Sequence, residues 1–423
     1  MREMKDSGIA WIGEIPREWE VANIGACTNE VVCPNTDCSE SNALQFKMGS
    51  IISKKGGDSK YHPDTLAAYT KVKKGDIVIN GLNLSFDLIS QRVGLVRERG
   101  VITSTYLTLR PTELLYSNYL AYLFKAYDNC KAFHGMGRGL RQILSYNELK
   151  KYFLVLPPLS EQHLISSYLD AKCSEIDSAL SLQEQMISEL RAYKQSLITE
   201  TVTHGLNPNA KMKNSGVEWI GDVPEGWEVR RLKNIGAAKN GLTYSPADLA
   251  SENDGTLVLR SSNIKEGKLV FNDNVYVNTD IPSSLMVKKG DVIICSRNGS
   301  AALVGKCAIV EEDINATYGA FMMRFQSVYY YKYIYYLLSS AITQYKPLFA
   351  TTTINQLTVG MFGNMKMSFT ENASEQHSIA TFLDEKCAEI DALIVLREKK
   401  MEALKEYKKS LIYECVTGKK EIV

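Results

Sequence analysis

The chain carries SEQHLISSYLDAKCSEIDS at residues 160–178 and SEQHSIATFLDEKCAEIDA at residues 374–392, and these stretches are identical at twelve of nineteen positions. An internal repeat of this kind indicates that one structural unit is built twice. Gly and Pro are absent from 160–203 and from 374–417, and apolar residues recur four and three positions apart. This heptad spacing predicts a long helix in each copy.

The predicted helix seam occupies equivalent positions in both copies. Its residues are Leu169, Cys173, Ile176, Leu180, Ile187, Leu190 and Leu197, and then Leu383, Cys387, Ile390, Ile394, Met401, Leu404 and Leu411. Polar groups interrupt the seam at Gln183 and Lys194 and at their counterparts Arg397 and Lys408, where they cost stability but can fix register. We expect the two helices to pair as an antiparallel coiled coil. The alternative is that each packs as an ordinary amphipathic helix on its own domain.

A second repeat precedes each helix by about 150 residues. SGIAWIGEIPREWEV (7–21) matches SGVEWIGDVPEGWEV (215–229) at nine of fifteen positions. KKGDIVIN (73–80) resembles KKGDVIIC (288–295), and LRAYKQSLITETVT (190–203) returns as LKEYKKSLIYECVT (404–417). The chain is therefore a tandem duplication with pseudo-two-fold symmetry, and the remainder of each half has diverged.

The repeats divide the chain into four parts. The expected domains are a first globular domain at 1–159, a spacer helix at 160–205, a second globular domain at 206–373, and a spacer helix with a C-terminal tail at 374–423. Ser160 and Ser374 are the expected N-caps. All four tryptophans lie in the motif that opens each globular domain, and the motif is alike in both halves. We interpret it as an architectural aromatic clasp in which Pro16 and Pro224 set the turn.

The two globular domains have a mixed α/β pattern, so the predicted fold class is α+β. Short apolar runs predict strands at 76–81, 94–103, 104–111, 256–262, 291–296 and 321–326. A tyrosine-rich helix is expected at 117–130 in the first half and at 330–345 in the second. These tyrosines could stack on bases, but packing of the helix on a sheet is the favoured interpretation.

Composition and motifs argue against an enzyme. No metal-binding or nucleophile motif is present, and GSAALVGK (299–306) fails as a phosphate loop because Ser300 and Cys307 stand at its key positions. The nine cysteines contain no C-x-x-C pair, which favours reduced thiols. No apolar run is long enough to span a membrane, so a cytoplasmic protein without membrane contact is expected. No cofactor, metal or catalytic residue is predicted in this chain.

Recognition is expected in the divergent loops, which are rich in Lys, Arg, Asn, Ser, Thr and Gly. Such side chains contact phosphates and base edges, and the two globular segments carry net charges of +4 and +2. Gln142 and Gln356 lie equally far before the two helices. The candidate DNA-binding residues are Lys54, Lys55, Asn80, Asn83, Ser85, Arg92, Arg138, Arg141, Gln142, Arg260, Ser262, Asn263, Arg297, Asn298, Ser300, Thr352, Thr353, Asn355 and Gln356.

The chain resembles the specificity subunit of type I restriction-modification systems. The resemblance rests on the doubled SG-x-x-WIG-x-x-P-x-x-WEV motif, the doubled SEQ helix start, and the alternation of divergent and repeated segments along the whole chain. It implies that each divergent segment is a target recognition domain for one half of a bipartite sequence in double-stranded DNA. It also implies that the two helices form a coiled coil that docks two modification subunits.

The resemblance places the chemistry in partner subunits. Modification subunits would carry S-adenosylmethionine and methylate adenine, and restriction subunits would use ATP and Mg²⁺. The residues themselves leave the target bases open. One departure from the family pattern is ENASEQ in place of LPPLSEQ before the second helix, which predicts a looser junction there. The alternative function is a bipartite coiled-coil scaffold for proteins, without a role on DNA.

Overall fold

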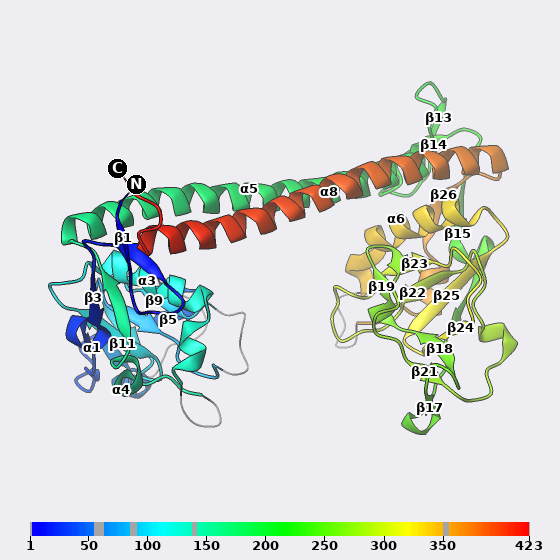
Figure 1. The fold of residues 1–423 in the computed structure, drawn as a ribbon. Helices are drawn as coiled ribbons and strands as arrows, with labels where there is room; N and C mark the ends of the chain where they lie inside the picture. The colour runs from blue at the N-terminus through cyan, green and yellow to red at the C-terminus, as the bar shows by residue number, and fades with distance from the viewer. Residues whose placement is uncertain (1, 55–62, 85–90, 138–141, 350–354, 423) are drawn as a thin grey trace. The chain divides into compact units, whose positions relative to one another are not determined.

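The repeated helices are continuous in the computed structural model, which describes residues 2–54, 63–84, 91–137, 142–349 and 355–422. Helix α5 spans Leu159–His204 and α8 spans Ala373–Val416 (Figure 1). The chain forms two compact units, unit 1 with Met1–Glu184 and Glu398–Val423, and unit 2 with Gln185–Arg397. Each unit thus holds one globular part, the start of one long helix and the end of the other. The boundaries of the four predicted domains stay a prediction.

The core sheet of unit 1 is antiparallel and has four strands. Its strands in spatial order are β4 (Thr28–Glu30), β11 (Leu107–Pro111), β8 (Ile77–Ile79) and β9 (Val93–Leu95). The smaller strand pairs are β1 (Met4–Asp6) with β2 (Glu14–Pro16), β3 (Glu20–Asn23) with β12 (Phe153–Leu156), β5 (Leu44–Lys47) with β6 (Ser50–Ser53), and β7 (Thr70–Val72) with β10 (Gly100–Ile102). The short helices are α1 (Ile24–Cys27), α2 (Pro63–Ala67) and α4 (Tyr146–Leu149).

Unit 2 repeats the antiparallel core sheet and adds a second sheet of four strands. The core strands in order are β16 (Gly236–Asn240), β25 (Met322–Ser327), β22 (Val292–Cys295) and β23 (Cys307–Ile309). The second sheet consists of β17 (Leu249–Ala250), β21 (Tyr276–Val277), β18 (Thr256–Leu259) and β24 (Ala316–Tyr318). The remaining pairs are β13 (Met212–Asn214) with β14 (Asp222–Pro224), β15 (Glu228–Arg231) with β26 (Lys366–Phe369), and β19 (Ile264–Lys265) with β20 (Lys268–Leu269); the short helix α7 spans Val359–Gly363.

A tyrosine-rich helix packs beside the core sheet in each unit. Helix α3 (Ser117–Asn129) contacts β9, and α6 (Tyr331–Phe349) contacts β23. Tyr119 and Tyr333 are fully buried, so the predicted packing role of these tyrosines is confirmed. One expected strand is wrong in detail, because the run at 94–103 turns between β9 and β10 and pairs with two different neighbours.

The doubled tryptophan motif forms the predicted clasp. Trp19 is completely buried, its backbone N–H donates to Pro16 O (3.0 Å), and its indole Nε1–H donates to Glu161 Oε2 (2.9 Å). In unit 2 the indole Nε1–H of Trp227 donates to Glu375 Oε2 (3.0 Å). The clasp therefore joins the two repeated motifs, since each glutamate belongs to the SEQ sequence that starts a long helix.

The helix starts differ from the predicted caps. Helix α5 begins before Ser160, and Pro158 O accepts from the backbone N–H groups of its first turn. Helix α8 is capped by Asn372, whose Oδ1 accepts from the N–H groups of Ser374 (3.0 Å) and Glu375 (3.3 Å). The serines are thus not N-caps, because the residues before them already satisfy the free N–H groups of the first turn.

The second helix junction is as well connected as the first, contrary to the looser junction expected there. Gln376 Nε2 donates to Thr370 O (2.8 Å), and Gln162 Nε2 donates to Pro157 O (2.9 Å) in the first copy. Thr370 also donates its hydroxyl to Glu375. The Asn372 cap and these side-chain bonds replace the Pro-Pro pair.

Within each unit the start of one long helix runs beside the end of the other. Lys408 Nζ lies 2.6 Å from Asp177 Oδ1 in unit 1, and Lys194 Nζ lies 2.7 Å from Asp391 Oδ2 in unit 2. The seam residues also join the core of their unit, as Leu169 and Leu383 do. The expected antiparallel pairing of the helices is confirmed, and each helix also packs on a globular part. Most of the predicted seam is buried, while Leu180, Leu190, Leu197 and Leu404 are half-buried.

Each long helix ends at a glycine against a clasp. Gly205 (φ +73°) follows α5, and a Cβ there would lie 3.2 Å from the Trp227 ring. Gly418 (φ +73°) follows α8, and a Cβ there would lie 2.2 Å from Pro16 and 3.2 Å from Trp19. Left-handed backbone and this close approach both favour glycine. The motif that opens each globular part thus also receives the end of a long helix.

Other expectations concern thiols, metals and membranes. All nine cysteines are free. In the part of the chain that the structure describes, no cluster of His, Cys, Asp or Glu is arranged to hold a metal ion. None of the described helices combines the length and apolar character that a bilayer crossing requires.

Candidate nucleic-acid interface

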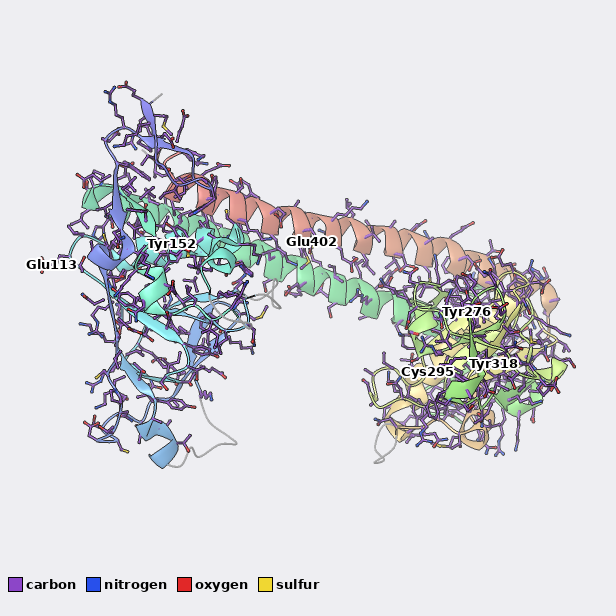
Figure 2. All side chains as sticks on the ribbon, turned by 60° about the horizontal axis from the view of Figure 1, so that its bottom comes forward. Glu113, Tyr152, Tyr276, Cys295, Tyr318 and Glu402 are labelled. Carbon is purple, nitrogen blue, oxygen red and sulfur yellow. The ribbon has the colours of Figure 1, made fainter. Side chains whose placement is uncertain are left out.

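The ends of several strands meet at one edge of unit 2. Strand β22 ends where β25 begins, with Cys295 opposite Met322, because these neighbours are antiparallel. Strands β18 and β24 are parallel and end together, with Leu259 opposite Tyr318. Figure 2 labels Cys295 and Tyr318, the last residues of β22 and β24. Loops far apart in the sequence therefore converge here.

These loops enclose a groove of about 1180 Å³. The lining residues are Leu242, Thr243, Tyr244, Pro246, Leu249, Arg260, Ser261, Ser262, Asp273, Val275, Arg297, Asn298, Gly299, Gly319, Ala320, Phe321, Met322 and Asn355. Two large apolar side chains stand exposed on it, Leu249 (55%) and Phe321 (61%). Polar side chains and exposed apolar surface in one groove are typical of a binding site.

Two arginines face the groove in different states. Arg260 Nη2 donates to Asp273 Oδ2 (2.9 Å) and to Asp273 O (3.0 Å), so an acidic side chain compensates its charge. The guanidinium of Arg297 lies over the Phe321 ring, 5.3 Å from the centroid. Among the described residues no carboxylate forms an ion pair with Arg297. The charge of Arg260 is therefore balanced by Asp273, whereas no carboxylate in the described part of the chain balances the charge of Arg297.

The same pair of loops meets in both units. In unit 2 Leu357 N–H donates to Ser296 O (2.8 Å), and Arg297 forms a backbone bridge with Gln356. In unit 1 Leu144 N–H donates to Gly81 O (2.9 Å). This contact lies beside Gln142, which stands at the position equivalent to Gln356. The two units therefore present corresponding loops, although the loop sequences differ.

The loop after β8 in unit 1 is held from beneath by a buried arginine. Arg92 is fully buried, and its Nη1 donates to the carbonyls of Asn80 (2.9 Å) and Leu82 (2.7 Å). Its backbone N–H donates to Asp128 Oδ2 (2.7 Å). A buried cation needs such partners, so Arg92 fixes the loop and leaves the Asn83 side chain exposed above it.

Comparisons with known proteins agree with this arrangement. A family model described as the type I restriction modification DNA specificity domain matches residues 224–405. The specificity subunit of the type I restriction enzyme MjaVIII from Methanocaldococcus jannaschii is 22% identical over 423 aligned residues, covering 96% of this chain and 93% of the relative. The chain is thus similar to type I restriction-modification specificity subunits over nearly its whole length.

Solved structures share its fold. One is a chain from a study of complex assembly and conformational transition in a type I restriction-modification system, with a TM-score of 0.71 at 14% identity, covering 96% of this chain and 99% of that one. The HsdS subunit from Thermoanaerobacter tengcongensis gives a TM-score of 0.50 at 14% identity, covering 96% and 98%. The predicted α+β tandem fold is confirmed. The relatives matched are specificity subunits of type I restriction enzymes, which agrees with the expectation of a DNA-recognition subunit without catalysis of its own.

The structure corrects two of the predicted DNA-binding residues. Arg92 and Asn263 are both fully buried, so neither side chain can reach DNA. Asn263 Nδ2 donates to Val270 O (3.0 Å), and its Oδ1 accepts from Arg260 N–H (3.0 Å). Polar residues in divergent loops are typical of exposed surface, but these two side chains satisfy the loop's own backbone groups.

The other described candidates fall into two groups. Arg260, Ser262, Arg297, Asn298 and Asn355 line the unit 2 groove, and Ser300 and Gln356 are exposed in the loops beside it. In unit 1 Asn80, Asn83 and Gln142 belong to the two meeting loops, whereas Lys54 follows β6 apart from them. Their contacts with DNA stay a prediction. Lys55, Ser85, Arg138, Arg141, Thr352 and Thr353 lie outside the described residues.

Sequence reasoning missed the apolar and acidic side of the groove. Tyr244, Leu249, Asp273 and Phe321 line it but were not candidates. Phe321 follows Thr317-Tyr318, a pair that echoes Thr105-Tyr106 in the first half. That repeated pair could have drawn attention to the residue. Burial raises the pKa of the nearby Cys295 thiol and of Tyr318, so both stay protonated at neutral pH.

Proposed function

We propose that each unit reads one half of a bipartite sequence in double-stranded DNA, and that bound modification subunits methylate adenine in that sequence. The observation that carries this proposal is the meeting of corresponding loops at the strand ends of both units. The frame beneath these loops is repeated, whereas the loop sequences differ. Two units with the same framework and different loops suit a DNA target with two different halves.

The unit 2 groove supports contacts with base edges. It combines a cation without a carboxylate partner, exposed hydroxyl groups and exposed apolar side chains, which are the groups that read bases. The net charge of the whole chain is +1, so partner subunits would supply much of the contact with phosphates. S-adenosylmethionine, and ATP with Mg²⁺ where restriction subunits join, would bind in those partners.

An exchange of one recognition segment tests the proposal. We expect replacement of residues 20–155 by the segment of another specificity subunit to change one half of the methylated motif and leave the other half intact. Exchange of residues 228–369 is the matched experiment and should change the other half. Mapping of methylated adenines across the genome gives both results. An unchanged motif after both exchanges would contradict DNA reading and favour the scaffold alternative.

We propose further that the long helices dock two modification subunits. Large apolar side chains stand exposed at equivalent positions of the helices, Leu182 (53%) and Tyr407 (52%) in unit 1 and Leu396 (63%) and Tyr193 (58%) in unit 2. A hollow of about 240 Å³ beside Tyr193 is lined by residues of both helices, the largely apolar Met186, Leu190, Tyr193 and Leu393 together with the charged Glu189 and Arg397. Exposed apolar surface of this kind is typical of a protein interface, and its duplication suits two copies of one partner.

Charge insertion tests the docking. We expect Leu182→Glu and Leu396→Glu each to release one modification subunit, measured as the mass of the assembled complex. Ser188→Glu, at an exposed polar position of α5, is the control and should leave the stoichiometry unchanged. Full assembly of the double variant Leu182→Glu/Leu396→Glu would refute this surface.

A further inference from the structure

The groove of unit 2 contains several polar side chains, but most already have partners in the protein. Arg260 is engaged by Asp273, and Asn298 uses both ends of its amide, donating to Ser261 Oγ (3.2 Å) and accepting from Ser300 N–H (3.0 Å). Asn355 Nδ2 donates to Gly299 O (3.2 Å). These hydrogen bonds hold the three side chains against the protein and leave them fewer donors and acceptors for a base.

Arg297 differs from these residues in its side chain. Its guanidinium lies over the exposed Phe321 ring, 5.3 Å from the centroid, and this cation–π contact uses none of its N–H donors. Arg297 has no carboxylate partner among the described residues. It is therefore an arginine in the groove whose donors are oriented but not used.

The backbone around Arg297 is fixed on both sides. Its N–H and that of Ser296 both donate to Phe321 O (3.1 and 3.0 Å), and Ser296 O accepts from Leu357 N–H (2.8 Å). Phe321 thus positions Arg297 twice, through its carbonyl and through its ring. A side chain held in this way loses little conformational entropy on binding.

The neighbouring wall argues for a base rather than a phosphate. The Asp273 side chain is 71% exposed beside the groove, and its pair with Arg260 leaves little net positive charge there to attract the DNA backbone. The exposed apolar surfaces of Phe321 and Leu249 likewise suit base edges and thymine methyl groups better than phosphates. In such surroundings Arg297 is better placed to hydrogen-bond a base edge than to attract a phosphate.

From this geometry we propose that Arg297, positioned by Phe321, reads a guanine in the half-site recognised by unit 2. The planar guanidinium donates two parallel hydrogen bonds to O6 and N7 of guanine in the major groove. Arg260 instead is a structural residue that holds the segment around Asp273. The inference rests on the proposed function, because it assigns one base contact within it.

The test uses the full chain assembled with its modification subunits and a panel of duplexes, each changed at one base pair of the target. We expect the wild-type complex to prefer one guanine of the unit 2 half-site about 10- to 100-fold. Replacement of that guanine by 7-deazaguanine, which lacks N7, should reduce methylation by wild type. Arg297→Ala should remove most of this preference at that position and at no other.

Two further variants separate reading from charge and from folding. Arg297→Lys retains the charge but loses the planar fork, so it should also relax the preference. Lys265→Ala, an exposed cation outside the groove, is the matched control and should retain it. Equal weakening on every duplex with a smaller salt dependence would overturn the inference in favour of a phosphate contact. Unchanged preferences would overturn it as well, provided that the melting temperature matches wild type.

The outcome is distinguishable from failure of the proposed function. If exchange of residues 228–369 changes the methylated motif while Arg297 variants retain every preference, unit 2 reads DNA by other residues. If that exchange leaves the motif unchanged, unit 2 does not read DNA. A unit 2 half-site without guanine also refutes the assignment directly.

Discussion

The two units share equivalent contacts around the long helices, but they differ in the loops at the strand ends. The equivalent contacts are Trp19–Glu161 and Trp227–Glu375, Tyr122–Asp170 and Tyr336–Asp384, and Lys408–Asp177 and Lys194–Asp391. Each involves a residue of a repeated long helix. Duplication has therefore preserved contacts that attach each globular part to a long helix, and contacts that join the two long helices within each unit.

The loops that follow β8 and β22 are supported in different ways. In unit 1 the buried guanidinium of Arg92 binds the loop carbonyls. Lys306 stands at the equivalent place in unit 2, where its carbonyl accepts from Cys295 N–H just as Arg92 O accepts from Asn80 N–H (both 2.8 Å). An ammonium group lacks the planar fork of a guanidinium. The frame thus fixes where a loop starts, while single buried residues determine its shape.

Removal of a clasp tryptophan should have the largest effect. We expect Trp19→Ala and Trp227→Ala each to lower the free energy of unfolding of their own unit by about 3–5 kcal/mol, because a large buried ring is lost. Urea unfolding gives the loss, and hydrogen exchange of peptides from each unit shows where it occurs. Trp19→Phe retains most of the ring and should cost much less. Loss of protection in the other unit would contradict the assignment.

Removal of an aspartate charge should distinguish the two KKGD turns. Asp76 makes a bidentate pair with Arg110 (both 2.8 Å), whereas Asp291 lies 3.5 Å from Arg324. We expect Asp76→Asn to destabilise unit 1 by about 2 kcal/mol at neutral pH and Asp291→Asn to cost unit 2 less. Urea unfolding with hydrogen exchange measures both. Equal losses of stability would show that the shorter distances of the Asp76–Arg110 pair do not make it stronger than the Asp291–Arg324 pair.

The contribution of Asp291 to the stability of unit 2 should depend on pH. Burial raises the pKa of Asp291 above its usual 3.8. The folded unit therefore holds this proton more tightly than the unfolded chain, and the contribution of Asp291 to stability decreases as pH rises from about 4 through the raised pKa. Asp291→Asn should thus lose its disadvantage toward neutral pH, measured by unfolding of wild type and variant across pH 4–7.

Removal of a helix lysine should have the smallest effect. Lys194 and Lys408 pair with aspartates that are about half exposed, so Lys194→Ala and Lys408→Ala should each cost below about 1 kcal/mol. The two costs should be similar, and 0.5 M salt should reduce both. Double-mutant cycles with Asp391→Ala and Asp177→Ala measure the coupling. A large loss of stability for one lysine variant alone would show that the two lysine–aspartate pairs are not equivalent.

The sequence by itself determined the repeated parts of this protein. Heptad spacing and the absence of Gly and Pro gave both long helices to within one or two residues at their starts. Identity between the halves marked the tryptophan motif as architecture, since residues that read different DNA should differ. These features were predictable because periodicity and repetition are local properties of the sequence.

The tertiary structure alone decided which divergent residues face a binding groove. Sequence composition could not separate buried Arg92 and Asn263 from exposed Arg297, because all three are polar residues in divergent loops. Nor could it reveal Phe321 beneath Arg297 or Asp273 beside Arg260. Burial and pairing depend on strands that meet across long stretches of chain, so the convergence of strand ends determined the groove.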